Sequence, residues 1–291
     1  MVDACTRGLD TGFVALGYAK VGVLGVLQGI TELLPISSTA HMRVVPALLG
    51  WQDPGSAFSA AMQVAALAAV ISYFWSDVEG LMFGTLGAIK RRDFHDWNFR
   101  FSIWIILATL PIVIAGVLLS PVLNACGSPL RALSVIGVSC IVMGALLALA
   151  EIYSTHKRTL DHVGLRDAMI VGFAQVGALI PGVSRSGSTL TAALFLDLER
   201  AQAARFSFLL GIPAIAAAGL KEMWELHKAH LSAHGWSILI FGIVIASISA
   251  FAAIWGLMRI LERFSAWPFV IYRIVLGVFL LVGVFMGFLP N

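Results

Sequence analysis

The residues with the clearest chemical potential lie in two short polar segments that interrupt long apolar stretches. The first segment contains Gln28 and Glu32, which are four positions apart and therefore share one face of a helix. A carboxylate in an apolar membrane environment costs several kcal/mol unless it is paired, hydrated or bound to a cation. Glu32 is therefore a candidate base or metal ligand, and the carbonyl oxygen of Gln28 is a second candidate ligand for a hard cation.

Hydroxyl groups follow this pair directly. Pro35 ends the expected helix, and Ser37, Ser38 and Thr39 come next. His41 lies three positions after Ser38, so it would reach the Ser38 hydroxyl as a base if a helical turn follows. The chemistry indicated is attack by an activated serine. The spacing leaves open whether Ser37 or Ser38 faces a substrate.

The second polar segment, residues 181–189, is suited to binding a phosphate. Arg185 has a planar fork of donors that fits two phosphate oxygens. The glycines allow backbone amides to approach an anion, and a helix beginning near Thr189 would direct its positive end at that anion. The hydroxyl donors of the segment are Ser184, Ser186, Ser188 and Thr189.

Each of these residues also has a structural interpretation, which the sequence leaves open. Serine and threonine hydroxyls often bind a carbonyl of their own helix, and Gln28 can hydrogen-bond to a neighbouring helix. His41 can be a capping or interfacial residue. Glu32 can pair with Arg185, and this ion pair would hold the two segments together.

The composition indicates that these segments lie in a membrane. The chain has 291 residues, of which 59% are hydrophobic and 12% charged, and its mean hydropathy is +0.92. A soluble domain carries roughly 25% charged residues, so most of the surface must face lipid. We expect a single transmembrane domain over residues 1–291. The net charge of +3 gives no indication of nucleic acid binding, and Cys5, Cys126 and Cys140 predict neither a disulfide framework nor a metal site.

The sequence predicts an all-α polytopic membrane protein with six full crossings. They are Phe58 to Trp75, Phe101 to Leu119, Leu133 to Ala150, Phe206 to Leu220, Trp236 to Leu257 and Phe269 to Leu289. Three basic connections, at residues 90–100, 157–166 and 259–273, are expected in the cytoplasm. The uncharged stretch from Ser120 to Pro129 is expected outside, and residues 80–89 are interpreted as an interfacial helix.

Residues 12–50 and 168–196 contain the two polar segments, and each is interpreted as a re-entrant helical hairpin. Irregular backbone at membrane depth survives only where protein or water satisfies its polar groups. A pair of interrupted segments in two halves indicates an internal repeat with its site near the midplane. We therefore predict an inverted-topology repeat, with repeat one at about residues 12–150 and repeat two at about residues 166–290. Both chain ends would then lie outside.

Together, the two polar segments resemble the motifs of the undecaprenyl-diphosphatase family, bacterial membrane enzymes also linked to bacitracin resistance. The first motif is matched by Gln28, Glu32, Pro35, Ser37, Ser38, Thr39 and His41. The second is matched by Pro181, Gly182, Ser184, Arg185, Ser186 and Thr189. The likeness spans nearly the whole chain.

The resemblance implies hydrolysis of undecaprenyl diphosphate to undecaprenyl phosphate, the lipid carrier for peptidoglycan precursors. It implies a multi-pass protein of the bacterial inner membrane whose site opens to the periplasm, with a polyprenyl diphosphate lipid as its partner. It also implies a divalent cation, Mg²⁺ or Ca²⁺, as cofactor. The oligomeric state is left open, and a homo-oligomer is compatible with the sequence.

On the family pattern, Ser38 is the expected nucleophile, Glu32 the base or metal ligand, His41 a proton shuttle and Arg185 the phosphate clamp. The further phosphate-binding residues expected from the resemblance are Ser37, Thr39, Ser184, Ser186 and Thr189. Position 28 is Gln rather than the Glu of the more acidic version of the motif. Glu32 is therefore the only carboxylate of this motif that can act as a base or as a charged metal ligand, and Gln28 would be an uncharged metal ligand.

A transporter is the competing interpretation. Inverted repeats and broken helices are typical of secondary transporters, and a polyprenyl-phosphate flippase would also need an anion site. The set of Glu32, Ser38 and His41 favours the enzyme, because binding alone would not require it. An ion channel fits less well, since one Arg and one Glu do not form a charged ring.

Overall fold

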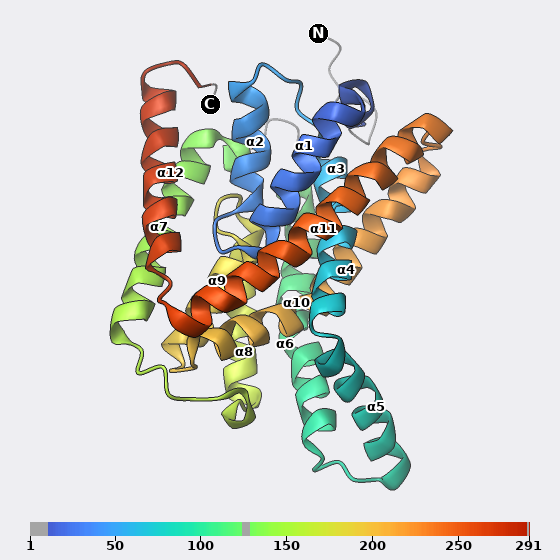
Figure 1. The fold of residues 1–291 in the computed structure, drawn as a ribbon, viewed down its shortest axis with the longest axis vertical. Coiled ribbons are helices and arrows are strands. Elements are labelled where there is room, and N and C mark those ends of the chain that lie inside the picture. The colour runs from blue at the N-terminus through green and yellow to red at the C-terminus, as the bar shows by residue number, and fades with distance from the viewer. Residues whose placement is uncertain (1–10, 124–128, 290) are drawn as a thin grey trace.

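The structure is a computed structural model that describes residues 11–123, 129–289 and 291. The described chain is helical (Figure 1), apart from one isolated β-bridge between Arg158 and Leu198. The α-helices are α1 (Phe13–Leu33), α2 (Ser38–Leu48), α3 (Ser56–Ala61), α4 (Gln63–Tyr73), α5 (Trp75–Arg91), α6 (Trp97–Leu123), α7 (Leu133–Tyr153), α8 (Leu165–Val176), α9 (Arg185–Phe195), α10 (Arg200–Lys228), α11 (Ala233–Arg263) and α12 (Trp267–Phe285). Short 3₁₀ turns are η2 (Pro129–Arg131), η3 (Leu160–His162) and η4 (Gly177–Leu179).

Six helices in the described ranges are long and apolar enough to cross a membrane: α1, α6, α7, α10, α11 and α12. A further pair, Ala57–Tyr73 and Trp75–Arg91, passes the same test together but is bent by 81°. By length and composition the protein is therefore a multi-pass membrane protein with an all-helical fold.

Five of the six predicted crossings coincide with these helices, and one does not. Phe58 to Trp75 corresponds to α3 and α4, which together form the helix Ala57–Tyr73; this helix passes the spanning test only together with α5, from which it is bent by 81°. The predicted interfacial helix at residues 80–89 is part of α5, which is 17 residues long. In contrast, α1 has the length of a crossing although it was expected to be only the first arm of a hairpin. Apolar composition alone does not reveal where a helix bends.

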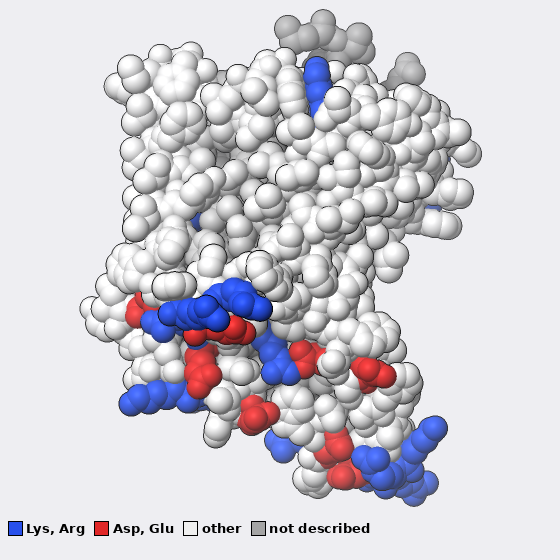
Figure 2. Space-filling view, viewed as in Figure 1, with Lys and Arg blue, Asp and Glu red and all other residues white. Residues whose placement is uncertain are grey.

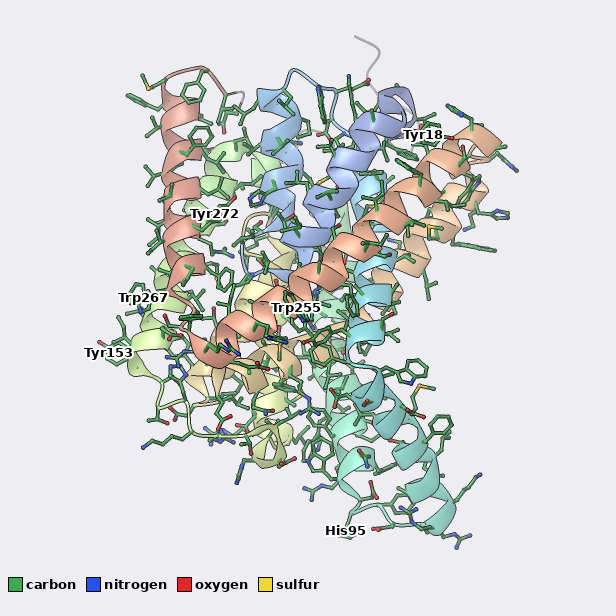
Figure 3. All side chains as sticks on the ribbon, in the orientation of Figure 1. Tyr18, His95, Tyr153, Trp255, Trp267 and Tyr272 are labelled. Carbon is green, nitrogen blue, oxygen red and sulfur yellow. The ribbon has the colours of Figure 1, made fainter. Side chains whose placement is uncertain are left out.

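The charged residues gather at one end of the molecule. Figure 2 shows Lys, Arg, Asp and Glu on the lower part of this face, whereas the upper part is almost uncharged. The α5–α6 and α7–α8 connections lie at that lower end, and the α11–α12 connection lies near mid-height, at the upper border of the charged part (Figure 1). Just above them lie the exposed rings of Tyr153, Trp255 and Trp267 (Figure 3). Aromatic side chains at this level are typical of a membrane–water interface.

Both predicted interrupted stretches are helix, break and second helix. The first is α1, a break at residues 34–37, and α2; the second is α8, η4, a break at residues 180–184, and α9. Figure 1 shows α2 returning to the end at which α1 begins, while α8 begins at the opposite, charged end. The two breaks lie in the middle of the molecule.

The second helices of the two hairpins begin in the same way. Ser37 has a φ of 73° and its side chain accepts a hydrogen bond from the Ala40 amide. Ser184 has a φ of 71° and its side chain accepts from the Gly187 amide. A positive φ is costly for a residue with a Cβ, so both serines hold strained turns that their capping bonds stabilise.

Close helix packing holds the hairpins in place. α1 packs along α11, where a Cβ on Gly29 would lie 2.4 Å from the Ala246 carbonyl oxygen. α8 packs along α6, where a Cβ on Gly172 would lie 2.2 Å from the Ala108 carbonyl oxygen. Small residues at such crossings allow the close backbone approach that drives helix association in lipid.

Some sequence features fall outside the described residues. The stretch predicted as an outer loop, Ser120 to Pro129, overlaps the end of α6, and its residues 124–128 are not described. Cys5 and Cys126 also lie outside the described residues. Cys140 is a buried free thiol in α7.

We expect Gly172→Ala to destabilise the protein by about 1–3 kcal/mol, because the new methyl group has no space against the α6 backbone. Gly256→Ala in α11 is the matched control, since its Cβ would meet nothing within 4 Å. That variant should be neutral or stabilising by up to about 1 kcal/mol. Thermal unfolding in detergent checks both, and equal effects of the two variants would contradict the packing argument.

Candidate active site

The two breaks contact each other directly. The hydroxyl of Ser186, in the first turn of α9, donates to the carbonyl of Glu32 at 3.3 Å and to the carbonyl of Leu34 at 3.1 Å. These carbonyls belong to the end of α1 and the first break. The residues of the two polar segments, which are about 150 positions apart in the chain, therefore form one site.

Glu32 is the acceptor for the neighbouring polar groups. Its Oε2 accepts from Gln28 Nε2 at 3.0 Å and from the Ser38 hydroxyl at 2.7 Å. The residue is 7% exposed. A carboxylate that accepts the proton of a serine hydroxyl at this distance has the geometry of a general base acting on a nucleophile.

Arg185 faces Glu32 at the outer limit of ion-pair distance and makes no hydrogen bond to it. The closest approach of the two groups, from Arg185 Nη2 to Glu32 Oε1, is 3.9 Å, and the arginine side chain is 10% exposed. Its Nε, Nη1 and Nη2 are buried and have no hydrogen-bond partner among the described residues. Buried donors are normally satisfied, so an unpaired guanidinium indicates that an anion is the missing partner. The ion pair with Glu32 is therefore present, but it leaves the hydrogen-bond donors of Arg185 available.

Gly211 in α10 makes room for this guanidinium. A Cβ at position 211 would lie 2.0 Å from Arg185 Nη1 and 3.0 Å from its Cζ. Any larger residue would push the arginine head group into the space in front of it. Gly211 therefore sets the direction in which Arg185 points.

A cavity lies where these groups meet. It has a volume of about 190 Å³, and its polar lining residues are Glu32, Ser38, Thr39, Gln63, Ser184 and Arg185. A second cavity of about 380 Å³ shares Ser38, Thr39 and Gln63 and adds Gln28, Arg43 and Asp53. A third, of about 530 Å³, is lined mainly by apolar residues of α6 and α10 and shares Ile112, Ala214 and Ala218 with the first. A polar chamber thus opens beside an apolar groove.

Other predicted site residues support the backbone rather than line this chamber. Ser37 caps α2. Thr189 is fully buried, and its hydroxyl contacts the Ser207 hydroxyl at 2.5 Å and the Arg185 carbonyl at 2.8 Å. Ser186 joins the two breaks, as described above. These hydroxyls hold the site together from outside the cavity.

His41 is engaged away from Ser38. Its Nδ1 lies 2.7 Å from the Ser37 carbonyl, and its Nε2 lies 2.6 Å from the hydroxyl of Tyr272, with the two rings stacked. A neutral imidazole that donates from Nδ1 and accepts at Nε2 satisfies both contacts. Within the described residues its hydrogen bonds are to Ser37 and Tyr272, and Glu32 is the group that contacts the Ser38 hydroxyl.

Three residues of this region were not singled out from the sequence. Gln63, at the start of α4, lines both polar cavities. Tyr272 and Arg273 contact the hairpins from α12. Arg273 was counted as the end of a basic connection, but it lies within α12 and is buried. An arginine next to a long apolar run is by default a functional candidate in a membrane protein, and this signal could have identified it.

The donors available for a hard cation are few but suitable. No group of three or more His, Cys, Asp or Glu that could hold a metal occurs in the part of the chain that the structure describes. Gln28 Oε1, however, is buried without a hydrogen-bond partner next to the Glu32 carboxylate. Mg²⁺ is commonly held by one or two carboxylates together with substrate phosphates, and the Gln28–Glu32 pair fits that pattern.

Comparison with known proteins identifies the family. The sequence profile of bacitracin resistance protein BacA matches residues 21–279, which include both breaks. The chain belongs to this family. It is 75% identical over 263 residues to undecaprenyl-diphosphatase 2 of Mesorhizobium japonicum, which covers 90% of this chain and 100% of that relative. It is 49% identical to undecaprenyl-diphosphatase of Gloeobacter violaceus, over 95% of each chain. It is 46% identical to undecaprenyl-diphosphatase of Trichormus variabilis, over 99% of this chain and 91% of that relative.

In this BacA family member, we expect Gly211→Ala to weaken anion binding at least about tenfold, because charge-assisted hydrogen bonds from a displaced Arg185 lose about 1.5–3 kcal/mol. Calorimetric titration with methylenediphosphonate, which cannot be hydrolysed, measures the affinity. The thermal midpoint should change little, since a flexible side chain rather than backbone gives way. Unchanged affinity would show that Arg185 does not contact the anion.

Proposed function

We propose that the protein hydrolyses undecaprenyl diphosphate to undecaprenyl phosphate and inorganic phosphate. The relatives of 46–75% identity that cover nearly the whole chain are named for this activity. The observation that carries the proposal is the buried Arg185 guanidinium, which has no hydrogen-bond partner among the described residues and faces a carboxylate that accepts a hydrogen bond from Ser38. The reaction returns the lipid carrier that peptidoglycan synthesis uses.

The geometry supports Ser38 as the nucleophile. Glu32 takes the Ser38 proton, the serine oxygen bonds to the terminal phosphorus, and the bond from that phosphorus to the bridging oxygen breaks. Undecaprenyl phosphate leaves, and water then attacks the phosphoserine and releases phosphate. Arg185 stabilises the charge on the transferring group, which is the dominant contribution in phosphoryl transfer. In a variant of this route, water activated by Glu32 attacks phosphorus directly.

His41 supports this chemistry through its position. Its contact with the Ser37 carbonyl fixes the turn that presents Ser38, and its contact with Tyr272 fixes the ring. Thr39 and Ser184 line the chamber together with Ser38 and Arg185 and are the neighbouring donors for phosphate oxygens.

The charge balance of the chamber supports a divalent cation, Mg²⁺ or Ca²⁺. Arg185 and Glu32 carry opposite formal charges and cancel. A phosphate monoester brings about −1.5 to −2 at pH 7, so a diphosphate head group requires further positive charge. Glu32 and the Gln28 carbonyl oxygen would hold the cation, which supplies this neutralisation when bound.

The apolar groove beside the chamber supports a lipid-linked substrate. Its lining comes mainly from alanine and aliphatic residues of α6 and α10, and it meets the chamber at Ile112, Ala214 and Ala218. A prenyl chain could leave the polar chamber along this groove without crossing water. A soluble phosphoester would not need such a path.

The arrangement of helices supports an inverted repeat, with halves at about residues 12–150 and 166–290. Each half begins with a hairpin, α1–α2 in the first half and α8–α9 in the second. The second helix of each hairpin follows a serine with positive φ. The first hairpin enters from the end opposite to the second (Figure 1). With the basic end in the cytoplasm, the first hairpin opens to the outer face, and we place the site on the periplasmic side of the inner membrane.

A polyprenyl-phosphate flippase is the second candidate, favoured by the broken helices at mid-depth. Hydrolysis releases inorganic phosphate, whereas transport does not. Phosphate release from purified protein in detergent, where no leaflets exist, demonstrates hydrolysis. Binding without release in the same assay would favour transport.

We expect Arg185→Ala and Glu32→Gln to lower phosphate release by about 10³-fold or more, the range seen when a charge-stabilising or activating group is removed. Ser38→Ala should have an equally large effect. Thr191→Val is the matched control, because Thr191 is a buried hydroxyl of α9 that bonds its own helix at Gly187. Phosphate release from farnesyl or undecaprenyl diphosphate is the measurement. Normal turnover in Ser38→Ala would exclude the covalent route and leave direct attack by water.

We expect a chelator to abolish phosphate release and Gln28→Glu to lower the Mg²⁺ concentration needed for half-maximal activity. A second carboxylate adds charge to the cation site, while in the absence of cation it would repel Glu32. Activity titrated with Mg²⁺ in both proteins checks this. A large loss of activity in Gln28→Glu at saturating Mg²⁺ would refute a ligand role for position 28.

A further inference from the structure

We propose that Arg273 is a positioning residue that holds the two hairpin breaks against each other and so keeps Ser38 facing Arg185. The inference rests on the proposed function and adds a residue that neither motif contains. Arg273 lies on α12 and is 1% exposed.

The guanidinium of Arg273 bonds to both breaks at once. Its Nη1 donates to the Pro35 carbonyl at 3.0 Å, in the first break. Its Nη2 donates to the carbonyls of Gly182 and Val183 at 2.8 and 2.9 Å, in the second break. Its Nε makes a longer contact, 3.5 Å, with the Cys140 carbonyl of α7.

These carbonyls need a partner because the helices are interrupted there. Backbone groups outside helices cannot be left unsatisfied at membrane depth. A guanidinium has five donors in a rigid fork and can serve several carbonyls that lie in different directions. A lysine ammonium is a single point and cannot span the two breaks in the same way.

The carbonyls bound by Arg273 lie immediately before the reacting groups in the chain. Pro35 precedes the Ser37–Ser38 turn, and Gly182 and Val183 precede Ser184 and Arg185. Within the described residues, Arg273 forms no ion pair, and its hydrogen bonds go to backbone carbonyls. Among the described residues, no carboxylate therefore competes with the carbonyls of the breaks for the Arg273 guanidinium.

The start of α9 is shaped around this arginine. A Cβ on Gly187 would lie 2.9 Å from Arg273 Nη1. Next to Arg273, Tyr272 lies between α12 and α2 (Figure 3), where its hydroxyl bonds to His41. Two consecutive residues of α12 thus hold the hairpins by polar contacts.

The general packing of α12 is provided by other residues. α12 lies along α7, where Gly277 and Gly137 approach each other's backbone and Leu280 is fully buried in an apolar cluster. Arg273 can therefore be altered while that apolar packing remains. Removing the Arg273 guanidinium should therefore shift the two breaks relative to each other. A displacement of about 1 Å at a reacting group can lower the rate roughly 10²-fold.

The experiment compares Arg273→Met and Arg273→Lys with Leu280→Ala, a packing control on the same helix. We expect kcat to fall about 10²-fold in Arg273→Met, with KM changed less than about fivefold, since Arg185 still binds phosphate. Arg273→Lys should recover part of the loss. Leu280→Ala should lower the thermal midpoint with kcat nearly unchanged.

Hydrogen–deuterium exchange of the same proteins provides a readout independent of turnover. Arg273→Met should increase exchange in peptides covering residues 34–38 and 180–186, and Leu280→Ala should not. If the parent protein released no phosphate, the proposed function would fail, while the exchange data would still decide whether Arg273 joins the breaks.

The proposal is overturned if both Arg273 variants keep kcat within twofold of the parent. It is also overturned if break exchange is unchanged in Arg273→Met, or if Leu280→Ala loses as much kcat as the arginine variants. If Arg273→Met does not fold, Arg273→Lys alone decides, since it keeps the charge but not the fork. Normal kcat and normal break exchange in that variant would reject the role.

Discussion

The structure depends on satisfying non-helical backbone inside an apolar environment. Each hairpin break leaves carbonyls that no helix can serve, and lipid offers no donors. Side chains supply the missing donors. Ser186 donates to carbonyls of the first hairpin, and the Arg273 guanidinium donates to carbonyls of both hairpins. The requirement to satisfy backbone groups therefore also brings the polar side chains of both segments into one place.

The equivalence of the two second helices explains how the site is divided. Ser38 and Arg185 are both the first residue of an 11-residue helix that follows a serine with positive φ. In the proposed repeat they are matching positions, one with the proposed nucleophile and the other with a cationic side chain. In the proposed mechanism each half supplies part of the site: the first half supplies Glu32 and Ser38, and the second supplies Arg185.

The two charged groups of the chamber, Glu32 and Arg185, differ in their hydrogen-bond partners, and this difference determines which ligand the chamber can bind. Glu32 is hydrogen-bonded by Gln28 and Ser38, while Arg185 has no hydrogen-bond partner within the described residues. A site arranged in this way is prepared for an anion, because the ion pair with Glu32 leaves the donors of Arg185 without hydrogen bonds. Preorganised donors in a water-poor environment stabilise developing charge without rearrangement. The adjoining apolar groove allows the same anion to remain attached to a lipid.

The sequence by itself determined the membrane class, the positions of both breaks and the choice of Glu32, Ser38 and Arg185 as candidate site residues. These features are local. The length of an apolar run predicts a membrane span, proline and serine mark the end of a helix, and a charge within an apolar stretch is costly and therefore indicates a functional residue. Only the tertiary structure decided that the chain bends by 81° between α4 and α5, that His41 contacts Tyr272, and that Thr189 packs against Ser207. It alone showed that Arg273 reaches Pro35, 238 positions away. Spacing along a helix tells which residues share a face, but the partner that a side chain meets depends on how distant helices pack.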